Sequence, residues 1–238
     1  MDKNKLQNVT QNVTQSRKGN KFQYTSPIPG LHIYDNVWET SLDFFKKLET
    51  QEFWDAQNGV SGKIQWVRED YLDEEVGKRA STCWIWNSEE VKDALEEVID
   101  SYLWHWDLDP HSRESLRITK YSPNGEFFSM HADDTFATPR TTALVYYPND
   151  DYEGGELEFL HFGIKIKPKA GQLFLFPAAY SYEHKIYPVT GGNKRYTLVT
   201  FFNFMTEKER SNRSSMLDPN KYYQSDLKYV FDDNFGEI

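Results

Sequence analysis

The chain has 238 residues and a formal net charge of −10. Only 38% of the residues are apolar, but 16 Phe, 15 Tyr and 7 Trp predict a packed core rather than a disordered chain. The acidic balance argues against nucleic-acid and membrane-surface binding, and no stretch is apolar enough for a transmembrane helix. Because Cys83 is the single cysteine and the first 20 residues have no apolar signal-peptide core, we expect a soluble cytoplasmic protein.

The N-terminal half predicts a tail followed by strands and helices. Residues 1–24 are polar, and we expect them to form a flexible tail. A single folded domain follows over 25–206, and a polar C-terminal extension occupies 207–238. Within the domain, residue spacing predicts a short strand at 32–34, a helix over 41–56 and an amphipathic helix over 88–102.

The residue pattern changes after Pro110, where short runs of β-prone residues alternate with turn residues. No long helical pattern separates these runs, so 112–206 predicts an antiparallel sandwich or barrel, and 25–111 supplies supporting helices and strands. The predicted strands are 116–121, 127–132, 141–147, 156–162, 172–176, 184–187 and 196–204.

Two His-x-Asp triplets could start a metal site. On a strand, His131 and Asp133 point to one face, and His184 from a later strand would complete two imidazoles and one carboxylate. This ligand set leaves open positions and suits Fe(II) in oxygen-using enzymes. The rival set combines His105 and Asp107 with His161, and Lys169 follows in the turn 167–171.

Arg195 opens an apolar run that predicts a buried strand. A buried guanidinium needs an anionic partner, and a dicarboxylate ligand would supply one through bidentate hydrogen bonds. Lys194 is the alternative cation, and adjacent strand residues face opposite ways, so one of the two points inward. We choose Arg195, because Tyr196 and the apolar strand follow it.

At this point the sequence resembles the prolyl 4-hydroxylase-type Fe(II)/2-oxoglutarate-dependent dioxygenases. The resemblance runs from about Leu116 to Phe204. It is carried by ordered motifs, which are Tyr121-Ser-Pro-Asn-Gly-Glu-Phe127, His131-x-Asp133, Arg140-Thr-Thr-Ala-Leu-Val-Tyr-Tyr147, Gly154-Gly-Glu-Leu-Glu-Phe159, Pro168-x-x-Gly171-x-Leu173-x-x-Phe176, His184-x-x-x-Pro188-Val189 and Arg195-Tyr196. The resemblance implies a mainly β protein with flanking helices (α+β), whose core is a double-stranded β-helix, or jelly roll, with N-terminal supporting helices.

The resemblance also assigns roles to matching positions. His131, Asp133 and His184 would bind the catalytic iron, and Arg195 would hold the distal carboxylate of 2-oxoglutarate. The remaining matches, which would contact or line the cosubstrate site, are Tyr121, Tyr147, Leu157 and Val199. Arg140 falls where some members use an arginine near a peptide substrate.

The implied reaction is that of an oxidoreductase acting on paired donors with incorporation of molecular oxygen. The cofactors would be Fe(II), 2-oxoglutarate and O2, often with L-ascorbate as reductant, and 2-oxoglutarate would be decarboxylated to succinate. A prolyl residue of a peptide or protein is the leading substrate. Hydroxylation of a free amino acid or small metabolite, and a non-catalytic jelly-roll ligand-binding module, stay open as alternatives.

The segment 134–140 follows the expected metal-binding carboxylate and precedes the next strand. It is either a lid or substrate-contacting loop beside the iron, or an ordinary surface connection.

Overall fold

The computed structural model describes residues 12–39, 41–49, 52–55, 60–63, 66–71, 77–85, 88–108, 110, 112–134 and 139–203. The helices are α1 (Ser41–Glu49) and α2 (Glu89–His105), with 3-10 turns η1 (Leu160–Phe162) and η2 (Tyr180–Tyr182). The strands are β1 (Asn12–Gln15), β2 (Lys21–Tyr24), β3 (His32–Tyr34), β4 (Glu52–Asp55), β5 (Val60–Lys63), β6 (Val67–Tyr71), β7 (Lys78–Ile85), β8 (Ser112–Arg113), β9 (Leu116–Tyr121), β10 (Glu126–His131), β11 (Thr142–Tyr147), β12 (Tyr152–Gly154), β13 (Leu157–Phe159), β14 (Ile164–Ile166), β15 (Gln172–Pro177), β16 (His184–Gly192) and β17 (Arg195–Asn203). The expected mainly β architecture with flanking helices is confirmed.

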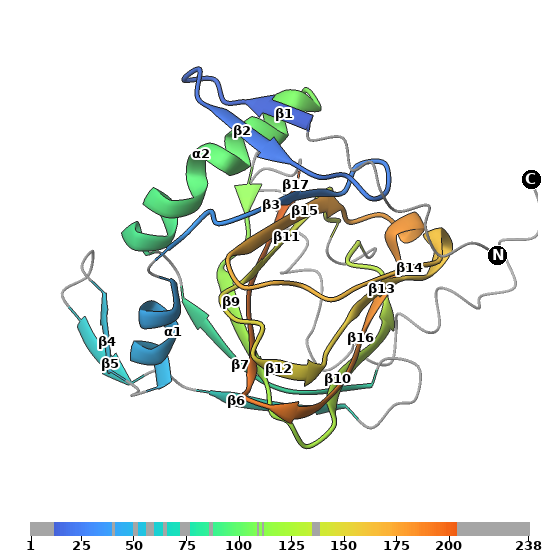
Figure 1. The fold of residues 1–238 in the computed structure, drawn as a ribbon. Coiled ribbons are helices and arrows are strands. Elements are labelled where there is room, and N and C mark those ends of the chain that lie inside the picture. The colour runs from blue at the N-terminus through green and yellow to red at the C-terminus, as the bar shows by residue number, and fades with distance from the viewer. Residues whose placement is uncertain are drawn as a thin grey trace, which may run out of the picture.

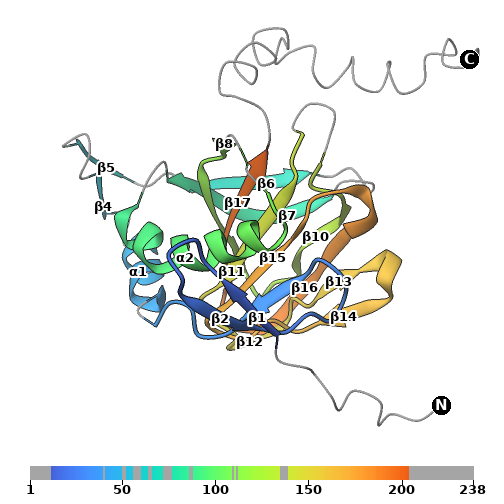
Figure 2. The same cartoon turned by 90° about the horizontal axis from the view of Figure 1, so that it is seen from above.

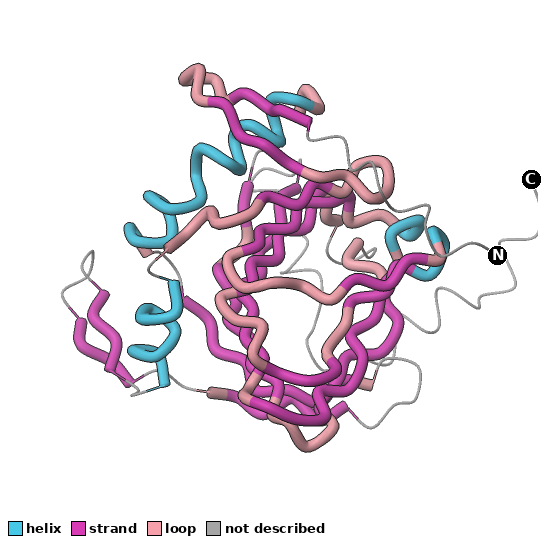
Figure 3. Tube along the Cα trace, viewed as in Figure 1, coloured by secondary structure: helices cyan, strands magenta, loops and turns pink. Residues whose placement is uncertain are grey.

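One large antiparallel sheet curls around an interior, and the helices lie outside it (Figures 1 and 3). Its strands follow the order β14-β13-β16-β10-β7-β9-β17-β11-β15-β3, with β6, β8 and β12 paired to β7, β17 and β16. Strands β10 and β7 share one pair in register, Phe128 opposite Lys78, and there the two walls of the curl meet. This is the double-stranded β-helix that the sequence led us to expect.

The sheet separates two apolar cores, because side chains alternate between its faces. On β9, Ile118 faces outward and packs in the core beneath the helices, whereas Tyr121 faces the interior. The outer core also contains Leu144, Leu175 and Leu198 from the sheet, with Leu95 from α2. The inner core joins the two walls through Leu157, Phe159, Ala143, Phe174, Phe176 and Phe201. Function is therefore expected on the inner face, where polar groups interrupt this core.

The two helices cover the outer face of the sheet, and Figure 2 shows them on one side of the strands. Ser88 caps α2, because its hydroxyl oxygen accepts a hydrogen bond from the backbone N–H of Val91 at 3.3 Å. The predicted helix over 41–56 is too long. Its chain leaves the helix after Glu49, and Glu52–Asp55 pairs as β4 with Val60–Lys63.

The N-terminal prediction of a flexible tail over 1–24 is wrong for 12–24. There β1 and β2 form an antiparallel hairpin that lies against α2 (Figure 1). Thr14 is buried beneath it, and its hydroxyl lies 2.9 Å from the hydroxyl of Ser101 on α2 and 3.2 Å from that of Tyr34 on β3. These contacts to distant residues order a polar segment whose own sequence gives little sign of burial.

Residues 1–11 and the predicted C-terminal extension over 207–238 lie outside the described residues. Among the residues that are described, no helix is both long enough and apolar enough to cross a membrane.

Candidate metal and cosubstrate site

Two strands bring the predicted metal ligands together. His131 ends β10, Asp133 follows it, and His184 begins β16 directly opposite His131. One candidate ligand atom from each residue lies within 4.8 Å of the others. The nearest carboxylate oxygens of Asp133 are 3.7 Å from Nε2 of His131 and 3.9 Å from Nε2 of His184.

Backbone carbonyls orient both imidazoles. Nδ1 of His131 lies 2.8 Å from the carbonyl oxygen of Ser129, and Nδ1 of His184 lies 3.0 Å from that of Tyr182. Because a carbonyl only accepts, each Nδ1 carries the proton and each Nε2 lone pair faces Asp133. Outer hydrogen bonds of this kind fix the tautomer and direction of metal-binding histidines.

Irregular pairing of β10 with β16 also shapes the site. The register shifts on both sides of Phe128, and this places the Phe128 ring in a stack on His131, with centroids 3.8 Å apart. Burial and the adjacent His184 together lower the pKa of His131 to about 3, so its imidazole is neutral at physiological pH. A neutral imidazole is the form that binds a metal.

The donor set fits a divalent cation. Asp133 is buried, with 7% of its side chain exposed, and among the described residues no Lys or Arg forms an ion pair with its carboxylate. A buried carboxylate without a cationic side chain as partner leaves an uncompensated negative charge, which a cation bound between it and the two imidazoles would balance.

The rival set is not brought together. His105 lies in the last turn of α2, with its ring centroid 5.2 Å from that of His32. His161 lies on η1, and its Nε2 is 3.4 Å from a carboxylate oxygen of Glu183. Within the described part of the chain, His131, Asp133 and His184 are the one group of three or more His, Cys, Asp or Glu side chains arranged to hold a metal.

Arg195 lies fully buried at the start of β17, opposite Tyr121. Its guanidinium carbon is 5.0, 5.2 and 5.9 Å from the ring centroids of Tyr121, Tyr147 and Tyr152. Nε donates to the carbonyl oxygen of Gly155 at 3.1 Å. The structure therefore places Arg195 in the interior, whereas Lys194 is only half-buried at the edge of the strand.

Four buried polar atoms in this pocket lack hydrogen-bond partners. They are Nη1 and Nη2 of Arg195 and the hydroxyls of Tyr147 and Tyr152, and no other buried side-chain nitrogen or oxygen of the described residues is in this state. An unsatisfied buried polar group costs about 1–3 kcal/mol. Their convergence on one place fits an oxygen-rich anion such as a carboxylate.

The tyrosines of the pocket remain protonated. Burial raises the pKa of Tyr121 to about 12, although Arg195 opposes the shift, and burial raises the pKa of Tyr147 as well. Each phenol can therefore donate its O–H to an anion at neutral pH.

Tyr152 was not predicted from the sequence, because it lies outside the motifs and enters the pocket only through the pairing of β12 with β16. The adjacent Gly-Gly pair is the sequence signal that could have indicated it. Gly155 has φ +66°, and a Cβ there would lie 2.8 Å from Cδ of Arg195. The guanidinium pocket thus needs glycine at this turn.

The predicted apolar residues link the two parts of the site. Leu157 is buried in the inner core, and Val199 is partly buried and packs against it. On β13, Phe159 pairs with His184, Leu157 lies two residues before it, and Gly155 at the beginning of this segment contacts Arg195. Leu157 therefore lies on the wall between the arginine pocket and the metal ligands.

Arg140 has several contacts of its own. Its guanidinium pairs with the carboxylate of Glu114 through two bonds of 2.8 Å, donates from Nη1 to the backbone oxygen of Asp133 at 3.1 Å, and covers the Phe201 ring at 3.8 Å. These contacts connect it to the metal loop, and its predicted substrate contact stays a prediction. Of the predicted lid, 135–138 lies outside the described residues.

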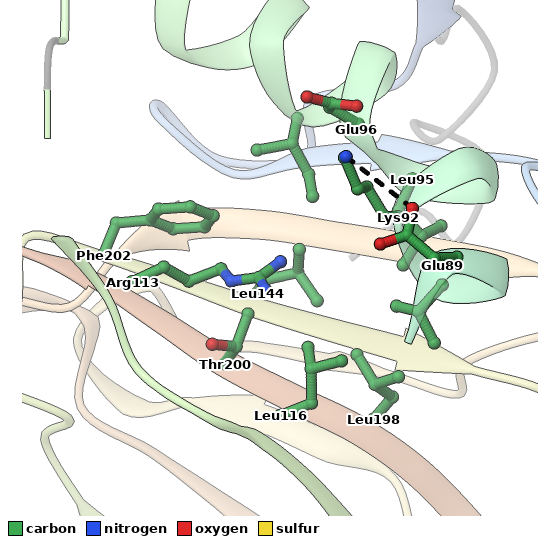
Figure 4. A pocket seen from close by; sticks show the side chains of 12 residues that line it. Glu89, Lys92, Leu95, Glu96, Arg113, Leu116, Leu144, Leu198, Thr200 and Phe202 are labelled. Atoms are coloured by element: carbon green, nitrogen blue, oxygen red, sulfur yellow. Dashed lines mark ion pairs between the residues drawn. The ribbon is translucent and has the colours of Figure 1, made fainter. Parts of the chain in front are cut away.

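A separate cavity of about 430 Å³ lies between α2 and the outer face of the sheet (Figure 4). Leu95, Leu116, Leu144 and Leu198 line it, and Lys92 and Glu89 form an ion pair of 3.7 Å at its edge. Because these side chains belong to the outer core, the sheet separates this cavity from His131 and Arg195. The cavity is not part of the candidate site.

Comparisons with known proteins agree with the fold. Residues 116–203 match the model of the 2OG-Fe(II) oxygenase superfamily. This match confirms the resemblance seen in the sequence. No curated protein matches the chain.

Three solved structures of prolyl hydroxylases share the fold at low sequence identity. The viral collagen prolyl hydroxylase of Paramecium bursaria Chlorella virus-1, in complex with 2-oxoglutarate, has a TM-score of 0.51 and 20% identity over 72% of this chain and 94% of its own. A Pseudomonas putida prolyl-4-hydroxylase gives 0.55 and 19% over 74% and 93%. The Trichoplax adhaerens prolyl hydroxylase, in complex with a hypoxia-inducible-factor peptide, gives 0.56 and 20% over 76% and 86%.

Proposed function

We propose that this protein is an Fe(II)- and 2-oxoglutarate-dependent dioxygenase that hydroxylates a residue of a peptide or protein, with a prolyl residue as the leading candidate. One observation carries the proposal. The buried His131-Asp133-His184 set lies in the same interior as a buried arginine whose two Nη atoms have no partner. A cation and a dicarboxylate together would satisfy both parts. We assign the reaction to a single domain over 25–206.

In this proposal, His131, Asp133 and His184 would hold the iron through two imidazole nitrogens and one carboxylate. Bound Fe(II) supplies the activation of O2, which is coupled to decarboxylation of 2-oxoglutarate to succinate. Arg195 binds the distal carboxylate of 2-oxoglutarate with its free Nη groups, and the hydroxyls of Tyr147 and Tyr152 donate to the same carboxylate. Tyr121 packs beside the guanidinium and completes its aromatic surround.

The apolar wall has a separate task in this proposal. Leu157 and Val199 exclude water along the length of the cosubstrate, and this strengthens the charge pairing at Arg195. Arg140 holds the backbone of Asp133 through its own contact and its pairing with Glu114, so we assign it a positioning role.

The test is formation of succinate from 2-oxoglutarate by purified protein with Fe(II), O2 and L-ascorbate, first without substrate and then with proline-containing peptides. We expect succinate in the absence of substrate, complete loss with a metal chelator, and loss in His184→Ala. His161→Ala is the matched control and should retain activity, because His161 is not one of the three side chains whose candidate ligand atoms come together. Activity that survives His184→Ala but disappears in His161→Ala would contradict the assignment.

Peptide-stimulated succinate formation with a gain of one oxygen atom in the peptide would support hydroxylation of a peptide residue. Stimulation by free amino acids alone would favour the small-molecule alternative. Binding of 2-oxoglutarate with no turnover under any condition would favour a non-catalytic binding module.

A further inference from the structure

Arg117 is the second residue of β9, and its side chain lies on the inner face of the sheet. It lies directly opposite Val199 on β17 and shares the inward face with Tyr121, four residues later. Its side chain is only partly buried, and its guanidinium carbon lies 5.5 Å from the centroid of the Phe201 ring. Arg117 was not assigned a role from the sequence, because nothing in the motif distinguishes it from a surface strand residue.

Two neighbouring cations, Arg140 and Lys78, have anionic partners among the described residues, and Arg195 faces the proposed cosubstrate pocket, whereas Arg117 has no such partner there. Arg140 covers the same Phe201 ring but is held by Glu114, and buried Lys78 forms an ion pair with Glu69. No hydrogen bond or ion pair of Arg117 occurs in the described part of the chain, apart from its contact with Phe201. A guanidinium is always charged, so this group is free to bind an anion.

Arg117 lies on the inner face of the sheet beside residues of both parts of the site. It is paired in register with Val199, which packs against the inner core, and Tyr121 of the arginine pocket shares its face. The Phe201 ring that it contacts is also covered by Arg140, whose Nη1 donates to the backbone oxygen of Asp133. Phe201 and Arg140 therefore link Arg117 to the metal loop.

Within the interior of the curled sheet, Arg117 is the cation whose charge no named anion balances in the proposed complex. In the proposed complex, the iron and Arg195 carry positive charges that Asp133 and the two carboxylates of 2-oxoglutarate offset. Glu114 and Glu69 are already engaged with Arg140 and Lys78. An anion brought by the substrate would have Arg117 as its available cation.

We propose that Arg117 binds a carboxylate carried by the substrate and so places the substrate beside the metal. This inference rests on the proposed oxygenase function. A guanidinium receives a carboxylate through two parallel hydrogen bonds, which fixes orientation as well as position. The carboxylate can belong to a free amino acid or to an acidic peptide, and the test separates these sources.

The experiment compares matched acid and amide probes. Proline-containing peptides with Glu or Gln next to the proline form one pair, and L-proline and L-prolinamide form the other. Each is titrated against wild type, Arg117→Met, Arg117→Lys and Lys120→Met, with Fe(II) and 2-oxoglutarate present. Lys120 is the control, because it lies on the same strand and its ammonium stacks on the Trp66 ring at 3.8 Å, packed beside the outer core. Anaerobic calorimetry measures binding, and succinate formation measures turnover.

In wild type we expect one acid probe to bind roughly tenfold to a hundredfold more tightly than its amide partner, as one charge-assisted contact gives. Arg117→Met should abolish this preference, Arg117→Lys should retain part of it, and Lys120→Met should leave it unchanged. All four proteins should make succinate at similar rates without substrate. The pair that shows the preference identifies the source of the carboxylate.

Equal binding of acid and amide probes to wild type, or a preference that survives Arg117→Met, would overturn the role of Arg117. Loss of substrate-free succinate formation in Arg117→Met alone would also overturn it, because Arg117 would then act on the metal or the cosubstrate. Absence of succinate formation in wild type would instead refute the proposed oxygenase function.

Discussion

Replacement of Arg195 by methionine tests the cosubstrate pocket through binding rather than turnover. The two Nη groups of Arg195 have no hydrogen-bond partner in the described structure, so when no ligand is bound the variant loses one hydrogen bond, from Nε to Gly155, and the guanidinium contacts with the tyrosine rings of the pocket. A neutral hydrogen bond is worth about 0.5–1.5 kcal/mol, and methionine removes a buried charge. We therefore expect the ligand-free variant to unfold within a few degrees of the wild-type melting temperature.

The ligand-bound proteins should differ much more. A ligand at about 100 times its Kd stabilises a protein by about 2.7 kcal/mol, which raises the melting temperature by roughly 5–11 °C for a chain of this size. Two charge-assisted bonds at about 1.5–3 kcal/mol each give a loss of more than a hundredfold in affinity, which reduces the stabilisation to about 0.4 kcal/mol or less. The shift in Arg195→Met should then be near 1 °C.

The assay is thermal unfolding with Fe(II) under anaerobic conditions, with and without 2-oxoglutarate at one fixed concentration. Lys194→Met is the matched control, because Lys194 is adjacent and charged but only half-buried at the edge of the strand. If 2-oxoglutarate raised the melting temperature of Arg195→Met as much as that of the wild type, or no longer raised that of Lys194→Met, the reasoning would be refuted. Lys194 would then be the residue that binds the distal carboxylate.

Three further predictions concern the support of the site and the outer packing. Arg140→Met and Glu114→Gln should each lower both the Fe(II) affinity and the rate of substrate-free succinate formation roughly tenfold, because the Arg140–Glu114 pair holds the backbone of Asp133. A variant that loses only substrate hydroxylation would instead show that Arg140 contacts the substrate. Burial, and to a lesser extent the charge of His105, lowers the pKa of His32 from 6.5 to about 3. Between pH 6.5 and about pH 3, the unfolded chain therefore binds a proton at His32 that the folded chain does not. The free energy of unfolding should fall as the pH decreases through this range. His32→Phe should flatten this part of the pH–stability curve in denaturant titrations, and an unchanged curve would contradict the assignment. Lys78→Met should destabilise the fold more than Lys78→Met combined with Glu69→Gln, because the single change leaves the largely buried carboxylate of Glu69 without its cation and with only the hydrogen bond from Thr82. Equal free energies of unfolding would show that the pair is not coupled.

Local sequence patterns predicted most of the sheet, because strand alternation and turn residues are short-range properties. The strands β9, β11, β15 and β17 lie within one residue of their expected bounds. The errors lie where distant contacts decide the structure. The hairpin over 12–24 depends on Thr14 meeting Ser101 on α2, and the helix from Ser41 is cut short where the chain turns into the pairing of β4 with β5.

The site divides in the same way. His131, Asp133 and His184 could be predicted because their types and order carry the chemistry, and pairing of β10 with β16 only had to bring them together. The roles of the arginines could not be predicted in this way, because the role of a guanidinium depends on which groups surround it in the folded structure. The guanidinium groups of Arg140 and Arg117 both contact the Phe201 ring, but Glu114 forms an ion pair with Arg140 and not with Arg117. Glu114 precedes β9 and lies 26 residues before Arg140 in the chain, so no local pattern indicates which of the two it would neutralise. Because a charge is available to substrate only when no protein group balances it, the folded structure favours Arg117 over the arginine that the sequence favoured.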